Sequence, residues 1–182
     1  MVMKMKYLIV SDIHGSSDSS NIIVSKFNEL KCDYILLLGD ILYHGPRNDL
    51  PECYNPKKVI SDLNPISDKI IAVKGNCDAE VDQMVLDFKI NDDYTLSYNN
   101  KNIYLTHGHH INYSNPTNKD VDVVLYGHSH IIKKDEVNNA IYINLGSITL
   151  PKENTARCYA ILENNVISIY DINDNLIISY TI

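Results

Sequence analysis

Short apolar runs alternate with helical patterns over the first two-thirds of the sequence, and this alternation constrains the fold more than any other feature. Three runs of four or five apolar residues have the length and composition of buried strands. They are Tyr7–Val10, Tyr34–Leu38 and Ile70–Val73. An order of strand, helix, strand, helix and strand predicts a sheet with helices outside it.

The segments between these runs carry helix signals. One helical face after the first run holds Ile23, Phe27 and Leu30. Ser20 or Asn21 would be the N-cap of that helix. A second helix is expected to begin at Pro56, because the first helical position needs no N–H donor. A short helix is expected soon after Asp78.

The last part of the chain has the pattern of strands separated by asparagine-rich turns such as Asn99-Asn100 and Asn164-Asn165. The expected strands are Tyr94–Tyr98, Ile103–Leu105, Val121–Tyr126, Ile141–Leu145, Cys158–Leu162, Val166–Tyr170 and Leu176–Tyr180. We expect one domain over residues 1–182. It would contain either a mixed sheet or two sheets packed face to face, with helices outside.

The charge balance weighs against nucleic acid as a stable partner. The chain has 182 residues, with 16 basic and 23 acidic side chains and a formal net charge of −7. Its only arginines are Arg47 and Arg157, and no basic run exceeds two residues. A protein that grips nucleic-acid phosphates needs a basic face. Bound divalent ions would nevertheless make an acidic chain locally positive.

The sequence predicts a cytoplasmic protein with no membrane segment. No stretch approaches the roughly 20 apolar residues of a membrane helix. The apolar run Tyr7–Val10 is shorter than a signal-peptide core, which has about 7–15 residues. The four cysteines form no C-x-x-C pair, which favours reduced thiols over disulfides or a structural zinc site.

Polar motifs follow five of the expected strands. They are Ser11–Gly15 (SDIHG), Gly39-Asp40, Lys74–Asp78 (KGNCD), Thr106–His110 (THGHH) and Gly127–His130 (GHSH). Residues two apart in an extended segment project to the same side, so Asp12 and His14 can meet one metal ion. Each motif alone is common in unrelated chains. Their coincidence at strand ends, where ligands bind in open α/β sheets, predicts a metal site.

In chain order these motifs are D-x-H, G-D, G-N, H and G-H-x-H, and the set resembles the calcineurin-like metallophosphoesterases. Two stretches, His44–Asn48 (HGPRN) and Gly75–Asp78 (GNCD), are similar to the small bacterial and archaeal phosphodiesterases of that family. The resemblance covers roughly residues 6–150. It implies a four-layer α-β-β-α sandwich of two mixed sheets flanked by helices, with a two-metal centre at the strand ends.

The resemblance also implies the ligands. Those of the first ion would be Asp12, His14 and His130, and those of the second Asn76, His107 and His128, with Asp40 bridging both ions. Imidazole, carboxylate and amide groups suit borderline divalent ions; we expect Mn²⁺, with Fe²⁺, Ni²⁺ and Zn²⁺ as alternatives. The implied reaction is in-line attack on phosphorus by a hydroxide that bridges the two ions.

Asp40 and Asn76 are expected to serve catalysis as well as metal binding, and three neighbours are further candidates. Arg47 would contact the phosphate or be a solvated loop charge. Cys77 stands where many members of the family have histidine, and a thiol cannot become cationic. We therefore expect a preference for diesters over monoesters. His109 would be a substitute general acid or a surface residue.

The function that follows is a metal-dependent phosphodiesterase acting on a small phosphodiester. One alternative is a phosphomonoesterase or nucleotide phosphatase with the same centre. The other is a non-catalytic protein-binding scaffold of the same fold, like the retromer subunit that resembles this family. All seven implied ligand positions hold metal-competent residues, which favours an enzyme. The β-rich C-terminus would offer an edge for a homo-oligomer.

Overall fold

A computed structural model describes residues 5–182 and contains two mixed β-sheets. The larger sheet has the strand order β12-β11-β10-β1-β2-β3-β4. Its strands are β1 (Tyr7–Val10), β2 (Tyr34–Leu37), β3 (Ile70–Val73), β4 (Ile90–Asn91), β10 (Cys158–Glu163), β11 (Val166–Asp171) and β12 (Leu176–Thr181). Strands β1 to β4 run parallel, whereas β10 pairs antiparallel with β1.

The smaller sheet has the order β5-β6-β7-β9-β8. Its strands are β5 (Tyr94–Tyr98), β6 (Lys101–Leu105), β7 (Val123–Tyr126), β8 (Ile132–Val137) and β9 (Ala140–Leu145). Strands β6, β7 and β9 are parallel, and the two edge strands are antiparallel to their neighbours. The two mixed sheets that the resemblance implied are therefore confirmed.

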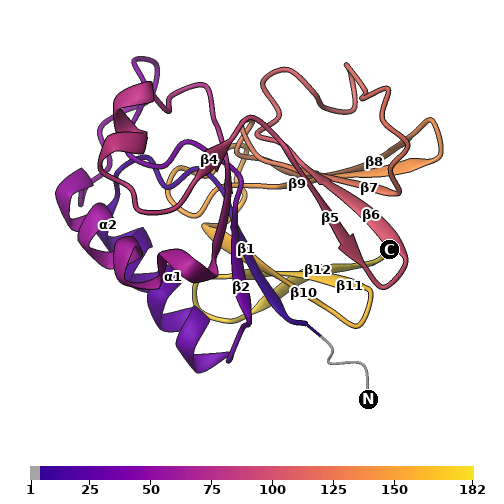
Figure 1. Cartoon of the computed structure of the whole chain (residues 1–182), viewed down its shortest axis with the longest axis horizontal. Coiled ribbons are helices and arrows are strands. Elements are labelled where there is room, and N and C mark those ends of the chain that lie inside the picture. The colour runs from indigo at the N-terminus through magenta and orange to yellow at the C-terminus, as the bar shows by residue number, and fades with distance from the viewer. Residues whose placement is uncertain (1–4) are drawn as a thin grey trace.

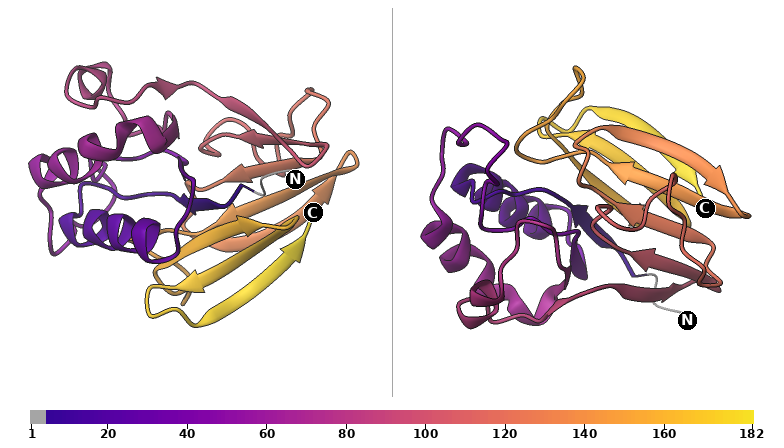
Figure 2. Two further views of the ribbon diagram at one scale, coloured as in Figure 1. Left: turned by 60° about the horizontal axis from the view of Figure 1, so that its bottom comes forward. Right: turned by 90° about the horizontal axis from the view of Figure 1, so that it is seen from above.

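Helices cover only the larger sheet. They are α1 (Ser17–Glu29), α2 (Pro56–Leu63) and the 3₁₀ helices η1 (Asn64–Lys69) and η2 (Glu80–Met84). Figure 1 shows α1 and α2 together on one side of the molecule, and both views of Figure 2 keep the helices away from the orange strands of the smaller sheet. None of the helices within residues 5–182 is long and apolar enough to cross a bilayer.

Three apolar clusters separate these layers, because successive strand residues face opposite ways. Leu8 and Ile35 face the helices, whereas Ile9 and Leu36 pack against the smaller sheet. On the far side of the smaller sheet, Tyr104, Val124 and Tyr142 form a third cluster with Ile111 and Val121. The fourth layer of the expected sandwich is thus a loop in residues 106–122 and not a helix.

The helix starts refine the sequence expectations. Helix α1 begins at Ser17, and its N-cap is Ser16, which lies four residues before Ser20 and accepts a hydrogen bond from Ser19 N. The assignment of Ser20 or Asn21 as the cap was wrong, because the first turn is polar and extends the helix beyond its apolar face. Helix α2 begins at Pro56 as expected, with Asn55 as its cap.

Candidate metal centre

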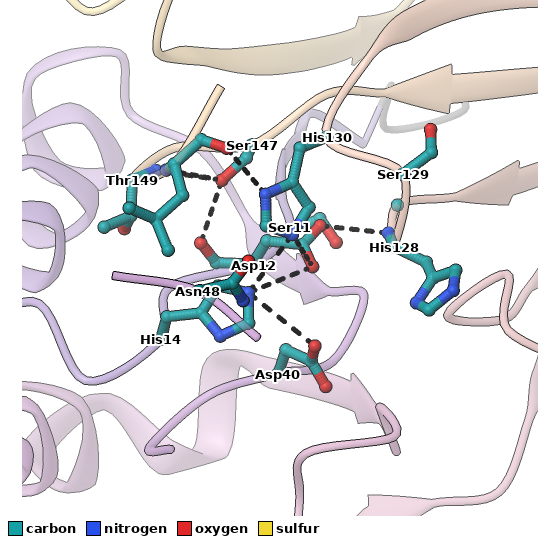
Figure 3. Close-up of polar contacts among 12 residues, drawn as sticks. Ser11, Asp12, His14, Asp40, Asn48, His128, Ser129, His130, Ser147 and Thr149 are labelled. Atoms are coloured by element: carbon teal, nitrogen blue, oxygen red, sulfur yellow. Dashed lines mark hydrogen bonds and ion pairs between the residues drawn. The ribbon is translucent and has the colours of Figure 1, made fainter. Parts of the chain in front are cut away.

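The predicted site residues come together at the edge where the parallel strands of both sheets end. Asp12 and His14 follow β1, Asp40 follows β2 and Asn76 follows β3. From the smaller sheet, His107 follows β6, and His128 and His130 follow β7. Five of these residues form what we call the ligand cluster, and all are buried: Asp12, His14, Asp40, His107 and His130. Figure 3 shows part of this cluster.

Asp12 lies at the centre of the ligand cluster with one oxygen free of hydrogen bonds. Its Oδ2 accepts a hydrogen bond from His128 N at 3.1 Å. Its Oδ1 is buried without a hydrogen-bond partner. The Nε2 atoms of His130, His14 and His107 lie 3.2, 3.6 and 3.9 Å from that oxygen. A buried carboxylate oxygen facing three imidazole nitrogens is suited to share a cation with them.

Three histidines are oriented by backbone carbonyls. His14 Nδ1 lies 2.9 Å from the carbonyl oxygen of Tyr43. His107 Nδ1 lies 2.7 Å from that of Leu38, and His130 Nδ1 lies 2.6 Å from that of Leu150. Each carbonyl can only accept, so Nδ1 carries a proton and Nε2 faces the cluster. The same arrangement orients histidines that bind metals.

The closest pair of imidazoles also indicates that a cation binds in the cluster. His14 Nε2 lies 3.2 Å from His130 Nε2, although both rings already donate through Nδ1. In the neutral rings two lone pairs would face each other, and either a proton or a metal ion between them removes the repulsion. Together with the unpartnered Asp12 oxygen, this geometry fits a divalent ion held by nitrogen and oxygen ligands.

A second group of ligand atoms surrounds Asp40. Its Oδ1 accepts a hydrogen bond from Cys77 N at 2.8 Å, and its Oδ2 lies 3.3 Å from His107 Nε2. Asn76 Oδ1 is 3.1 Å from the same imidazole nitrogen. The ligand atoms of Asp12, Asp40 and His107 all lie within 4.8 Å of one another, as do those of Asp12, His14 and His130. A third such set joins His14, Asp40 and Cys77, so the ligand sets overlap at Asp12, His14 and Asp40.

His128 takes a different position from the other expected ligands. Its backbone N–H binds Asp12, while its ring packs edge-on against His107 at 5.1 Å between centroids. Figure 3 shows the ring directed away from Asp12 and His14. The structure thus brings six of the seven expected ligand side chains into direct mutual contact, and it places the ring of His128 beside them.

The chain adopts left-handed backbone angles at the site. Their φ values are 60° at Asp12, 50° at His14, 54° at Asp40, 67° at His128 and 62° at His130. Such angles cost energy for residues with a side chain and persist where the surroundings fix them. Glycine permits the close approach: a Cβ at Gly75 would collide with the carboxylate and the backbone of Asp40, and one at Gly127 with Ser11 and Asp12. The strand ends are therefore shaped around these side chains.

The buried charges compensate one another. Burial acts to raise the pKa of Asp12, but the close imidazoles of His130 and His14 outweigh it and lower the pKa well below its usual range. The pKa of Asp40 is also lowered, because contact with His107 outweighs burial. The pKa of His107 rises to about 9, since its interactions with Asp40 and Asp12 outweigh burial. Both carboxylates are thus ionised at neutral pH, the state in which they bind metal ions.

A cavity of about 300 Å³, which we call the cationic cavity, opens beside the ligand cluster. It is lined by Asp40, Gly45, Pro46, Arg47, Asn48, Asn76, Cys77, His128, His130 and Lys152. Arg47 and Cys77 therefore share this cavity with Asp40, Asn76 and His130. Burial and the neighbouring Asp40 raise the pKa of Cys77 to about 12, so it is a neutral thiol at pH 7.

His109 is close to the ligands but does not line the cationic cavity. Its ring centroid is 5.4 Å from that of His107 and 6.1 Å from that of His128. Its Nδ1 is buried without a hydrogen-bond partner. Burial and repulsion from His107 lower its pKa to about 4, so this ring is neutral at pH 7.

Two residues of the site were missed by sequence reasoning. The buried carboxylate of Asp78 accepts hydrogen bonds from the backbone N–H groups of Asp40, Ile41 and Gly75 at 2.7–2.8 Å, and so it joins the ends of β2 and β3. Its place in the GNCD motif was the only signal. Lys152 lines the cationic cavity from a loop distant in sequence, and no motif marks it.

Comparison with known proteins agrees with this geometry. Residues 5–165 match the family model described as the calcineurin-like phosphoesterase superfamily domain. The chain belongs to this superfamily. It is 40% identical over 177 residues to phosphodiesterase YfcE of Escherichia coli K12, with 96% of each chain covered. Membership confirms the resemblance drawn from the motifs and the expectation of a phosphoesterase enzyme.

Solved structures show where this phosphoesterase fold recurs. A structure of Yfce, described as a phosphoesterase from E. coli, superposes with a TM-score of 0.93 at 37% identity and covers 98% of this chain and 100% of that one. Vps29 of Entamoeba histolytica, solved in complex with Zn²⁺, superposes with a TM-score of 0.61 at 21% identity, with 98% of each chain covered. The second likeness shows the shared fold alone.

Proposed function

We propose that this phosphoesterase is a metal-dependent phosphodiesterase with a dinuclear centre in the ligand cluster. The observation that carries the proposal is the buried, unpartnered Oδ1 of Asp12, which faces three Nε2 atoms within 4 Å. The name of the E. coli relative, a phosphodiesterase, supports diesters as the substrate class. The proposal treats residues 1–182 as one domain, because both sheets supply ligands.

The residues divide into two sets around shared carboxylates. Asp12, His14 and His130 would hold one ion; Asn76, His107 and His128 would hold the other; and Asp40 would bridge the two. When bound, two divalent ions would lower the pKa of a shared water toward neutrality and offset the charge that develops on the phosphate oxygens. Mn²⁺ is the proposed metal, because nitrogen and oxygen ligands suit it and the cluster contains no thiolate.

Side chains around the cationic cavity would bind and orient the substrate. Arg47 and Lys152 supply positive charge on the side where a phosphate would enter. Cys77 is neutral and adds no charge. A monoester dianion loses more from that absence than a diester monoanion, which supports the diester preference. His109 would exchange a proton with the leaving oxygen; in support, its ring lies 5.4 Å from that of His107 and its Nδ1 has no hydrogen-bond partner.

The alternatives differ in measurable ways. A phosphomonoesterase would use the same metal ligands, but its dianionic substrate would bind better with a cationic side chain at the position of Cys77. A protein-binding scaffold of the same fold needs no buried charges. The intact ligand cluster favours an enzyme over that scaffold, because buried charges are costly to keep without a role.

Two further proposals concern the setting of the enzyme. A cytoplasmic location fits the four free cysteines. Self-association would involve the edge strand β12, where Leu176, Ile177 and Ile178 are exposed.

The proposal is tested by removing and restoring the metal. The chelated protein should not hydrolyse bis(p-nitrophenyl) phosphate, and adding Mn²⁺ should restore turnover with about two ions bound per chain. Parallel assays with p-nitrophenyl phosphate should show slower monoester turnover at saturating Mn²⁺. Hydrolysis that survives chelation, or a single ion at full activity, would contradict the dinuclear mechanism.

A further inference from the structure

A second cavity lies on the other side of His128. It has a volume of about 430 Å³, and we call it the aromatic cavity. Its walls include Tyr113, Tyr126, Ser129, Ile131, Lys133 and Glu153. Figure 3 shows the side chains of His128 and Ser129 directed away from the Asp12 and His14 side chains. Because His128 lines both cavities, a substrate bound beside it can extend into either one.

The two cavities differ in charge. Neighbouring residues of one loop point into different cavities: Lys152 lines the cationic cavity and Glu153 the aromatic cavity. Lys133, in the aromatic cavity, is already paired with Asp135, with Nζ 3.2 Å from Oδ1. The aromatic cavity thus offers a carboxylate and no uncompensated cation, and an anionic substituent would be repelled there.

The surfaces of the aromatic cavity suit a flat ring. Tyr113 is 40% exposed, and Lys133 Nζ lies 3.6 Å from its ring centroid, which holds the ring in place. The buried ring of Tyr126 and the side chain of Ile131 add apolar surface. Ser129 accepts a hydrogen bond from Asn144, which leaves its hydroxyl hydrogen free to donate to a polar ring edge.

We infer that the aromatic cavity binds an uncharged planar ring carried on one ester oxygen of the substrate, either an aryl group or a nucleobase. The inference rests on the proposed function, in which the phosphate group lies at the ligand cluster. It makes Tyr113 a specificity-determining residue and names the substrate class as diesters with at least one aromatic arm. Exposed aromatic rings bind such groups by stacking.

The test measures binding and not turnover. Ethyl, phenyl and thymidin-5′-yl methylphosphonate share one anionic phosphorus group and differ only in the ester arm. Their dissociation constants are measured by titration calorimetry on the Mn²⁺-loaded protein. The phenyl ester should bind on the order of fivefold more tightly than the ethyl ester, the range expected for one aromatic contact. Tighter binding of the thymidine ester than of the phenyl ester would identify a nucleobase as the ring, and weaker binding would identify a simple aryl group.

Substitutions in the protein test which residues produce the difference in binding between the phenyl and ethyl esters. Tyr113→Ala should remove most of the difference between the phenyl and ethyl esters, whereas Tyr113→Phe should keep it. Tyr94→Ala, which removes another exposed tyrosine on β5, is the matched control and should also keep it. Glu153→Lys should tighten binding of the 4-carboxyphenyl ester relative to the phenyl ester.

Two results would overturn the inference. One is equal binding of phenyl and ethyl esters by the parent protein, and the other is an equal loss for both esters in Tyr113→Ala. Neither result touches the proposed function, which fails separately if the metal-loaded parent hydrolyses no diester.

Discussion

Among the places where the backbone is left-handed, the hairpin turns and the ligand cluster have different reasons for it. Three two-residue hairpin turns have positive φ at both positions: Asn99-Asn100, Asn138-Asn139 and Asn164-Asn165. Their strands twist in a way that favours such turns, and asparagine tolerates them. At the strand ends the same conformation occurs at Asp12, Asp40 and three histidines, where no hairpin requires it.

The unusual backbone angles serve strand pairing in the hairpin turns and side-chain placement at the ligand cluster. A hairpin turn is a local solution that serves strand pairing. At the ligand cluster the unusual angles aim side chains from both sheets at one point, and the flanking apolar clusters offset the cost. Changes at the cluster should therefore remove function while sparing stability, and changes in the turns should do the reverse.

Asp40→Asn should give the largest effect on function. The amide keeps the shape and can still accept from Cys77 N, but it removes the shared charge. We expect loss of at least one ion and a fall in diester turnover of at least about 10³-fold. The free energy of unfolding without metal should fall modestly at pH 7, because the lowered pKa of Asp40 means that its contact with His107 stabilises the folded state. Metal analysis, kinetics and denaturant unfolding check these points; parent-like turnover would refute the mechanism.

Asp78→Ala should lower both stability and activity, since this residue links the fold to the site. Three backbone donors lose a charged acceptor, at a net cost of about 3 kcal/mol after the relieved burial of the carboxylate. Thermal unfolding should shift down by about 6–12 °C. Asp78→Asn, which retains an acceptor, is the control and should shift Tm less. An unchanged Tm in Asp78→Ala would show that these hydrogen bonds contribute nothing.

Asn165→Val should lower stability alone. A β-branched residue at φ 62° costs about 1–2 kcal/mol, or about 2–8 °C in Tm. Turnover and metal content at 25 °C should match the parent. Asn165→Gly, which tolerates the angle, should unfold like the parent. Equal Tm values for the two variants would remove the distinction between the two regions.

Cys77→His should give the smallest effect, a change in preference. An imidazole beside Asp40 can be cationic and can donate a proton, so the ratio of monoester to diester turnover should rise several-fold. Cys77→Ser, which remains neutral, is the control and should leave the ratio near that of the parent. An unchanged ratio of monoester to diester turnover in Cys77→His would count against the explanation of the diester preference.

Local patterns predicted the regular parts of the fold. Runs such as Tyr7–Val10 and Ile70–Val73 became strands with the expected bounds, and Pro56 began α2. Strand β8 was missed, because Ile132–Val137 is an edge strand with charged, partly exposed side chains and no apolar alternation. The two-residue strand β4 is too short to leave a pattern. Edges and short strands depend on neighbours that a local window does not contain.

The residues of the site also differ in whether local sequence patterns predict them. Asp12, His14 and His130 were predictable because they lie in short motifs at strand ends. The roles of Asp78 and Lys152 were not, because one acts through three backbone donors and the other comes from a loop after β9. The outward direction of the His128 ring follows from packing against His107, which spacing alone does not reveal.

The ligand cluster draws on both sheets, with Asp12 from one and His130 from the other. A divalent ion seated between them would link two sheets that otherwise hold together through apolar packing and a few hydrogen bonds, such as the one from His128 N to Asp12. The loaded protein should then survive protease attack far longer than the metal-free chain, since the layers cannot part until the ion departs.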